Sequence, residues 1–380
     1  MGMYYEFFAG GGMARAGLGS GWTCLFANDF DAKKAASYAL NWGSDHLKIG
    51  DVAAVTTAEL PGSADLAWAS FPCQDLSLAG AGAGLKGERS GTFWPFWKLM
   101  KKLGEESRAP RLIVLENVCG ALTSHGGKDF AAIGAALSGA GYRYGAVVMD
   151  AVDFVPQSRP RLFIIGVHKS QPIPQRVIAP APDPDWHSPA LIEAYDGLAK
   201  RCREAWIWWQ LPAPPVRNTV FADLVEESPQ GVAWHTREQT RKLLDMMSQV
   251  NRAKVTAAKK AGRRMVGAIY RRTRLDECGK VQRAEIRFDD IAGCLRTPAG
   301  GSSRQVLMLV DGAKVRSRLL SPREAARLMG LPDDYRLPEN YNEAYHLAGD
   351  GVAVPVVRFL AANLLEPILS VGDAAEKEAA

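Results

Sequence analysis

Short apolar runs recur along the first 170 residues, and each is followed within two positions by a polar residue or a glycine. The clearest runs are 4–8, 22–27, 66–69, 111–115 and 162–167. Runs of this length with few polar residues are typical of strands that are covered by helices on both faces of a parallel sheet. The pattern therefore predicts an α/β fold with a doubly wound, mostly parallel sheet.

A glycine-rich turn follows the first run. Gly10, Gly11 and Gly12 separate it from a helix expected from about Met13. Such a turn lets the backbone approach a ligand, and the N–H groups of the following helix can hold an anion. A dinucleotide fingerprint is excluded because Arg15 stands where the pattern G-x-G-x-x-G needs its last glycine, and no G-x-x-x-x-G-K-[ST] phosphate loop occurs.

Two acidic residues stand at the ends of the next strands. Asn28 and Asp29 directly follow the run 22–27, and Asp51 follows the expected short strand 47–49. An acid about twenty residues after the glycine turn is well placed to accept hydrogen bonds from ribose hydroxyls. Together with the glycine turn, these carboxylates indicate a pocket for a nucleoside cofactor.

A cysteine follows the strand 66–69 in the stretch 70–77, SFPCQDLS. Pro72 offers no N–H to a strand ladder, so the chain must leave the sheet and place Cys73 at the carboxyl end of a strand. A thiol at that edge is reachable and can serve as a nucleophile. The glycine-rich stretch 79–87 that follows is expected to be a lid rather than a regular element.

Polar side chains also follow the predicted strand 111–115 and precede the predicted strand 162–167. Glu116 and Asn117 come directly after the first of these, where a carboxyl group would stand beside Cys73 and hold a proton near neutral pH. Arg159 and Arg161 enter the second, and strand alternation predicts that both point to one face and grip an anionic or carbonyl-bearing ligand.

Composition and charge narrow the class of protein. The six cysteines form no CxxC pair and no Cys/His cluster at zinc spacing, so neither a disulfide framework nor a metal site is expected. The segment 252–287 carries twelve Lys/Arg and three Asp/Glu in a chain of net charge +5, so the rest is slightly acidic. This concentration favours a polyanion-binding segment. No signal peptide or membrane span is evident, and we expect a cytoplasmic protein.

Taken together, the motifs resemble those of cytosine-C5 DNA methyltransferases in order and spacing. They are 8–12 (FAGGG), 72–74 (PCQ), 116–118 (ENV), 157–161 (QSRPR), 318–332 (RLLSPREAARLMGLP) and 349–355 (GDGVAVP). The resemblance covers most of the chain. It departs from the family pattern at Glu6, where Asp is usual, at Met13, where Gly is usual, and at Asp350, where Asn is common.

The resemblance implies a reaction and its residues. The Cys73 thiolate would add to C6 of a cytosine that has left the DNA helix, and C5 would then take a methyl group from S-adenosyl-L-methionine, leaving S-adenosyl-L-homocysteine. Glu116 would hold the cytosine N3 and amino group, and Asn117 would shape the pocket. Arg159 and Arg161 would steady the base carbonyl.

The same resemblance implies the cofactor site. Phe8 would stack near the adenine, while Gly10 and Gly12 would admit the methionine end. Asp29 would bind the ribose and Asp51 the adenine edge. Pro72, before the nucleophile, completes the set of expected cofactor-binding residues.

Domain limits and partners follow from the resemblance as well. The catalytic Rossmann-like methyltransferase domain is expected at 1–228 and 316–380, with a Pro/Trp-rich insertion at 171–215. The smaller, strand-rich target recognition domain is expected at 229–315. The candidate DNA-binding residues are Ser77, Arg89, Arg271, Arg272, Arg274, Arg296, Thr297 and Arg304. The implied partners are double-stranded DNA, bound by a monomer near the nucleoid, and a cognate restriction endonuclease.

Three alternatives remain open from the sequence. A tRNA cytosine-C5 methyltransferase shares the Pro-Cys-Gln chemistry, although the basic segment favours sequence readout of duplex DNA. A catalytically silent DNA-binding regulator of the same fold is disfavoured because Cys73 and Glu116 are both present. A nicotinamide oxidoreductase is disfavoured by the failed glycine pattern.

Overall fold

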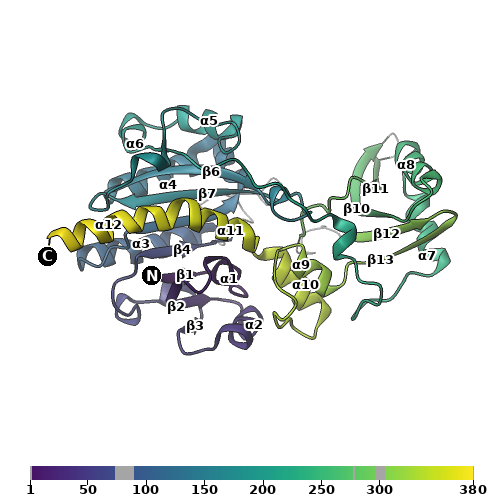
Figure 1. Cartoon of the computed structure of the whole chain (residues 1–380), viewed down its shortest axis with the longest axis horizontal. Helices are drawn as coiled ribbons and strands as arrows, with labels where there is room; N and C mark the ends of the chain where they lie inside the picture. Colours follow the sequence, from purple (N-terminus) through teal and green to yellow (C-terminus); the bar gives the residue numbers. More distant parts are fainter. Residues whose placement is uncertain (1, 73–89, 277–278, 297–303, 380) are drawn as a thin grey trace. The chain divides into compact units, whose positions relative to one another are not determined.

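Two compact units make up the chain in the computed structural model, which describes residues 2–72, 90–276, 279–296 and 304–379. The first unit contains Met1–Asp150, Pro160–Pro215 and Val352–Ala380, and the second contains Ala151–Arg159 and Val216–Gly351. Neither unit is continuous in sequence, because nine residues of the second interrupt the first between two of its strands (Figure 1).

A sheet of seven strands forms the centre of the first unit, in the order β3-β2-β1-β4-β5-β7-β6. Its strands are β1 (Gly2–Phe7), β2 (Trp22–Asp29), β3 (Leu47–Ile49), β4 (Leu66–Ala69), β5 (Leu112–Val118), β6 (Tyr142–Asp150) and β7 (Pro160–His168). The ladders among β1 to β5 are parallel, and only β7 runs antiparallel to its neighbours β5 and β6. The structure confirms the expected doubly wound, mostly parallel sheet.

Helices cover both faces of this sheet. They are α1 (Met13–Leu18), α2 (Ala32–Trp42), α3 (Phe93–Glu105), α4 (Lys128–Gly139), α11 (Val354–Leu360) and α12 (Glu366–Ala379). Alternate strand residues such as Phe7, Ala69 and Leu115 form one core with Phe96 of α3 and Ile133 of α4. Figure 1 shows α11 and α12 crossing the sheet from the carboxyl-terminal end of the chain.

The first and last parts of the chain pack together through α1 and α11. A Cβ atom on Gly17 would clash with the Val357 side chain and lie 2.7 Å from the carbonyl oxygen of Val354. Only glycine therefore permits this close approach. Helices from the two ends of the chain thus lie side by side in the first unit.

The segment 171–215 contains the short elements β8 (Ile178–Ala179), α5 (Pro189–Asp196), α6 (Lys200–Glu204) and β9 (Trp208–Trp209). Its tryptophans pack within the first unit. Trp209 is fully buried, and the ring of Trp206 contacts those of Phe130 and Tyr144.

An antiparallel sheet in the order β11-β10-β12-β13 forms the centre of the second unit. The strands are β10 (Met265–Asp276), β11 (Gly279–Arg287), β12 (Val306–Asp311) and β13 (Lys314–Leu319). The helices of this unit are α7 (Arg237–Asp245), α8 (Gln249–Lys260), α9 (Pro322–Arg327) and α10 (Tyr341–Asp350). One face of the sheet packs on α7 and α8 through residues such as Ile269, Ile286 and Met308.

This second unit extends beyond the predicted recognition domain, 229–315, at both ends. The buried guanidinium of Arg318 donates to both carboxylate oxygens of Glu324 at 2.6 and 2.7 Å and to the carbonyl oxygen of Glu226 at 3.0 Å. The Tyr345 hydroxyl accepts a hydrogen bond from the N–H of Gln305. These long-range contacts tie α9 and α10 to the strand-rich sheet.

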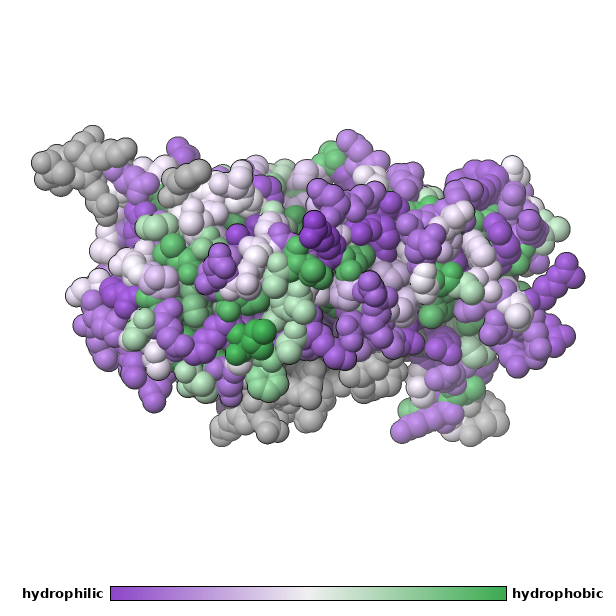
Figure 2. Space-filling view, turned by 90° about the horizontal axis from the view of Figure 1, so that it is seen from below, coloured by the Kyte–Doolittle hydropathy of each residue, from purple (hydrophilic) through white to green (hydrophobic). Residues whose placement is uncertain are grey.

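Surface composition is mixed in Figure 2, where hydrophilic residues dominate and hydrophobic ones are scattered. Among large apolar side chains, Phe30 is 76% and Leu275 is 81% exposed. The stretch Tyr341–Asp373 is long and apolar enough to cross a membrane, but 56% of its most apolar window is buried inside the protein. That burial is typical of core helices.

Candidate active site

The glycine turn after β1 has the backbone shape that a ligand pocket requires. Gly10 and Gly12 have φ angles of 57° and 76°, in the left-handed region that favours glycine. A Cβ atom on Gly12 would clash with the Trp42 ring, whereas one on Gly10 would meet open space. Phe8 takes the same left-handed conformation, with φ of 58°. The turn therefore leaves room beside Gly10 for a bound group.

Asp29 lies at the end of β2 and connects to this turn. Its carboxylate is 7% exposed and accepts hydrogen bonds from the N–H groups of Gly10 at 2.7 Å and Asp31 at 2.8 Å. Burial raises the pKa of this carboxyl above its ordinary value. A carboxylate offers about four lone-pair sites, so two bonds leave capacity for ribose hydroxyls.

The segment before Asp51 is fixed to the end of β2. The N–H of Gly50 donates to the carbonyl oxygen of Asp29 at 2.9 Å, and the Asn28 amide donates to the Gly50 carbonyl at 3.0 Å. Asp51 is exposed, and its Oδ1 accepts from the N–H of Ala53 at 2.9 Å. The two predicted cofactor acids thus belong to neighbouring strand ends.

Two residues near this pocket were not predicted from the sequence. Phe30 directly follows Asp29 and is 76% exposed, which gives it a large apolar surface beside that carboxylate. Glu6 is 1% exposed, and neither carboxylate oxygen has a hydrogen-bond partner among the described residues. Burial raises the pKa of Glu6 to about 8. The sequence signal that could have identified Glu6 is its position as an acid inside the apolar run 4–8.

The strand β4 carries the chain toward the predicted nucleophile. It lies between β1 and β5, and the sheet order reverses between β1 and β4. Ligands of open α/β sheets bind outside the carboxyl ends of strands at such a reversal. Pro72 is half-buried and is the last residue described here, so Cys73 lies outside the described residues.

Asn117 ties the end of β5 to the segment that leads to Cys73. Its buried amide donates to the carbonyl oxygen of Phe71 at 3.1 Å, and its Oδ1 accepts from the N–H of Val118 at 2.9 Å. Both polar ends of the Asn117 side chain are therefore used in positioning backbone.

Glu116 and Arg161 form an ion pair at this edge of the sheet. Because β7 runs antiparallel to β5, its first residues pair with the last residues of β5, Val118 opposite Arg161. The Arg161 Nε lies 3.3 Å from Glu116 Oε1, and both side chains are at most 15% exposed. The structure thus brings these two predicted catalytic residues together.

Arg159 has different partners, all within the second unit. It precedes β7 and is 2% exposed. Its guanidinium donates to the carbonyl oxygens of Leu295 at 3.0 Å, Gly349 at 2.8 Å and Gly351 at 2.7 Å, and to the Cys294 sulfur at 3.4 Å. Arg159 therefore holds two segments that are far apart in sequence.

The predicted DNA-binding residues fall into three groups. Arg271, Arg272 and Arg274 are exposed on β10, and Arg296 is exposed after it. Arg304 is half-buried, hydrogen-bonds Asn342 and lies over the Tyr341 ring. The remaining candidates, Ser77, Arg89 and Thr297, lie outside the described residues, as does the predicted lid 79–87.

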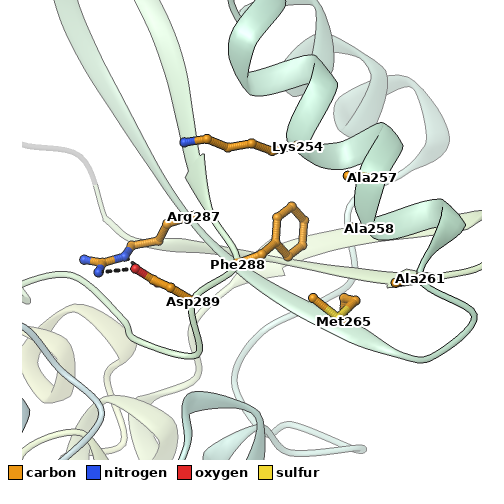
Figure 3. Close-up of a pocket in the computed structure, with 8 residues that line it drawn as sticks. All are labelled: Lys254, Ala257, Ala258, Ala261, Met265, Arg287, Phe288 and Asp289. Carbon is orange, nitrogen blue, oxygen red and sulfur yellow. Dashed lines mark hydrogen bonds and ion pairs between the residues drawn. The ribbon is translucent and has the colours of Figure 1, made fainter.

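A pocket of about 400 Å³ opens on the second unit between α8 and the end of β11 (Figure 3). Its lining includes Ala257, Ala261 and Phe288, and the Arg287–Asp289 ion pair lies at one side. None of the predicted catalytic or cofactor residues lines it. Among the described residues, no cluster of three His, Cys, Asp or Glu side chains is arranged to hold a metal ion.

A family comparison decides the identity of the chain. The family model for C-5 cytosine-specific DNA methylases matches residues 3–366. The chain belongs to this family. It is a DNA (cytosine-5-)-methyltransferase that uses S-adenosylmethionine as its methyl donor.

Curated relatives of the methyltransferase agree with this family. The Type II methyltransferase M.BsuFI of Bacillus subtilis is 26% identical over 96% of this chain and 73% of its own length. M.HhaI of Haemophilus parahaemolyticus is 23% identical over 95% of this chain and 93% of its own. The tRNA methyltransferase and silent regulator alternatives are not favoured by these relatives.

A solved structure shares the fold of the methyltransferase. The Dnmt2 methyltransferase of S. pombe aligns with a TM-score of 0.61 and 16% identity, covering 97% of this chain and 99% of that one.

The residues around the glycine turn of the first unit fit S-adenosylmethionine. The space beside Gly10 admits backbone-bound polar groups, and the unused lone pairs of Asp29 suit ribose hydroxyls. The orphaned Glu6 carboxyl lies on β1, which leads directly into the turn.

Proposed function

We propose that the methyltransferase acts on a cytosine extruded from duplex DNA, with Cys73 as nucleophile and Glu116 as proton donor. The observation that supports this assignment best is the Glu116–Arg161 ion pair at the end of β5, next to the strand that leads to Cys73. Cysteine addition needs a protonated or hydrogen-bonded N3 on the opposite side of the ring, and a carboxyl group can supply it.

The bond changes follow from these roles. The Cys73 thiolate forms a bond to C6 while Glu116 passes a proton toward N3, which makes C5 electron-rich. S-Adenosylmethionine, when bound, supplies an electrophilic methyl group for C5. A base then takes the C5 proton, the C6–sulfur bond breaks to release the thiolate, and the proton on N3 returns to Glu116, which restores the ring. The net change replaces hydrogen by methyl at C5.

The arginines and Asn117 have separate roles in this proposal. Arg161 contacts the base carbonyl, because its guanidinium is at the strand edge beside Glu116. Arg159 acts as a positioning residue, since its hydrogen bonds hold the backbone near Leu295 and Gly351. Asn117 positions the segment before Cys73 through the Phe71 carbonyl.

For the cofactor, Asp29 binds the ribose, Asp51 the adenine edge, and Gly10 and Gly12 admit the methionine end. Pro72 closes the site next to the nucleophile. Phe8 stacks near the adenine, and the exposed ring of Phe30 adds a second apolar surface there.

The proposal extends to domains and partners. The first unit carries catalysis, and the residues 229–315 carry target recognition, with Ser77, Arg89, Thr297 and the β10 arginines in contact with DNA. Relatives named Type II methyltransferases support a cognate restriction endonuclease as the functional partner. We expect the enzyme to act in the cytoplasm on nucleoid-associated DNA and to bind that DNA as a monomer. Light scattering of the protein–DNA complex measures its mass and so tests for a monomer.

A covalent trap tests the nucleophile. Duplex DNA with 5-fluorocytosine at the target has no C5 proton to lose, so the Cys73–C6 bond should persist and give an adduct on denaturing gels. Cys73→Ala should abolish both the adduct and methyl transfer while leaving duplex affinity largely unchanged. Bisulfite sequencing of host DNA measures methyl transfer.

Cys119→Ala serves as the matched control. Burial raises the pKa of the Cys119 thiol, so it is a poor nucleophile and its loss should leave the adduct unchanged. Turnover retained by Cys73→Ala would refute the assignment.

A further inference from the structure

The strands β10 and β11 continue past the sheet as a two-stranded ribbon. The strand β12 pairs only with Met265–Ile269 of β10, whereas β10 and β11 stay paired as far as Asp276 opposite Gly279. The part beyond Tyr270 has no third strand among the described residues. A two-stranded ribbon fits the major groove of B-DNA, and each base pair presents a distinct pattern there.

The two faces of the ribbon differ. Successive strand side chains point to opposite faces, and the face of Ile269 and Ile286 is buried on α7 and α8. The other face carries Tyr270, Arg272 and Arg274, with Glu285 directly opposite Tyr270. This second face therefore places an acid among the arginines of β10.

Glu285 contacts both arginines. Its Oε1 accepts from Nε of Arg274 at 2.6 Å and lies 2.6 Å from Nη2 of the same guanidinium. Its Oε2 lies 3.5 Å from Nε of Arg272. The side chain of Arg274 is 52% exposed, that of Arg272 is 50% exposed and that of Glu285 is 31% exposed. Exposed ion pairs of this kind contribute little to stability, so their main effect is on side-chain geometry.

That geometry leaves one side of the Arg274 guanidinium available. Its Nε edge faces Glu285, while Nη1 has no hydrogen-bond partner among the described residues. Nη1 and the second proton of Nη2 form a planar fork. A fork of this shape matches N7 and O6 of guanine, which is the commonest specific arginine contact in the major groove.

Hydrogen bonds connect this face to the Arg159 region within the same unit. Arg272 lies over the Tyr270 ring at 5.8 Å, and the Tyr270 hydroxyl donates to the Cys294 carbonyl at 2.9 Å. Arg159 holds Cys294 and Leu295 from the other side. The Arg274 face is thus connected to the segment that Arg159 holds, unlike the face covered by helices.

We infer that Arg274 reads a guanine of the target sequence and that Glu285 is the positioning residue that fixes its guanidinium for this purpose. The inference rests on the proposed role of the β10 arginines in DNA binding. Glu285 reduces the number of Arg274 conformers, so guanine is favoured over a phosphate, which a mobile arginine would satisfy equally well.

The test compares sequence profiles of methylation. A duplex library randomised around a fixed cytosine is methylated by the wild-type enzyme and by Glu285→Gln, Arg274→Gln, Arg274→Lys and the double variant Glu285→Gln/Arg274→Gln, and methylated positions are sequenced. Each single variant should lose about 10- to 100-fold discrimination at the same one guanine position. The double variant should lose no more than Arg274→Gln alone, because the two residues act as one unit.

Glu238→Gln is the matched control. Glu238 forms an exposed ion pair with Lys242 at 3.0 Å on α7, and its loss should leave the profile unchanged. The thermal unfolding temperature of each variant should match that of the wild type, since the Glu285–Arg274 and Glu238–Lys242 pairs are both exposed.

Two results would overturn the inference. One is a Glu285→Gln profile identical to that of the wild type. The other is an equal loss at all sequences, with weaker salt dependence, which indicates a phosphate contact. Failure of the proposed function is separate, because the wild-type enzyme itself would then yield no methylated motif, and this would overturn both proposals.

Discussion

At the scale of single residues, two buried carboxyl groups differ in whether they have a partner. Glu116 has a cationic partner in Arg161, at the sheet edge where the reaction is proposed. Glu6 is buried on β1, and its carboxylate has no hydrogen-bond partner within the described part of the chain. An unpaired acid avoids the cost of burying its charge by keeping its proton, whereas a cationic partner compensates the charge of a buried carboxylate.

Glu116→Gln should lower kcat by about 100- to 10,000-fold, because the amide keeps the shape of the side chain but cannot transfer a proton to N3. Steady-state methylation of a target duplex measures this. Glu105→Gln, at an exposed position on α3, should leave kcat unchanged. An unchanged kcat in Glu116→Gln would assign proton donation to another group.

Glu6→Gln should flatten the pH dependence of stability in the cofactor-free protein. The folded pKa of Glu6 is about 8 and its ordinary value is 4.5, so the folded state binds more protons between these pH values. Stability from this group is therefore complete below about pH 4.5 and is lost as pH rises toward 8, by at most about 5 kcal/mol.

Urea unfolding of wild type and Glu6→Gln from pH 5 to 9 checks this sign. The two proteins should be closest in stability at low pH, and the variant should be the more stable at pH 8. A wild-type protein whose stability rises over this range as steeply as that of the variant would contradict the raised pKa.

At the scale of elements, the strands and their mostly parallel arrangement were predictable, and the direction of β7 was not. The apolar runs identified β1, β2, β4 and β5 because buried parallel strands need few polar residues. Nothing in the run 162–167 indicates that β7 is antiparallel, yet this direction brings Arg161 to Glu116. Arg159 was identified as a site residue, but its partners Leu295 and Gly351 are distant in sequence, so its positioning role was not predictable.

Gly17→Ala should lower the free energy of unfolding by about 1–3 kcal/mol, because the added methyl group overpacks the contact between α1 and α11. Gly104→Ala is the control, since it lies in α3 with nothing within 4 Å of the added atom. That variant should be neutral or slightly more stable, as alanine favours helices. Chemical denaturation distinguishes the two, and equal effects would argue against the close packing of α1 and α11.

At the scale of the whole molecule, charge is concentrated in the second unit. The segment 252–287 carries twelve Lys/Arg and three Asp/Glu, and it includes most of α8 and the strands β10 and β11. Such a distribution favours the association of one part of the enzyme with polyanions. The domain limits were less predictable, because the buried Arg318–Glu324 pair extends the second unit past the last basic strand.

Duplex affinity should therefore fall steeply with salt, by a slope of about −0.9 in log K against log salt for each phosphate contacted. Arg271→Gln should reduce the magnitude of that slope by about 1 without changing the methylated sequence. Fluorescence anisotropy with a labelled duplex measures the slope. Lys101→Gln, exposed on α3, should have no effect, and an unchanged slope in Arg271→Gln would remove Arg271 from the phosphate contacts.

The nine residues Ala151–Arg159 belong to the second unit although they lie between two strands of the first. An exchange of recognition specificity with a relative that transplants 216–351 alone would leave Gln157 and Arg159 of the recipient facing foreign loops. Gln157 donates to the Leu328 carbonyl, and Arg159 donates to the Leu295 carbonyl. A functional chimera of this enzyme therefore needs two grafts, the long one and these nine residues together.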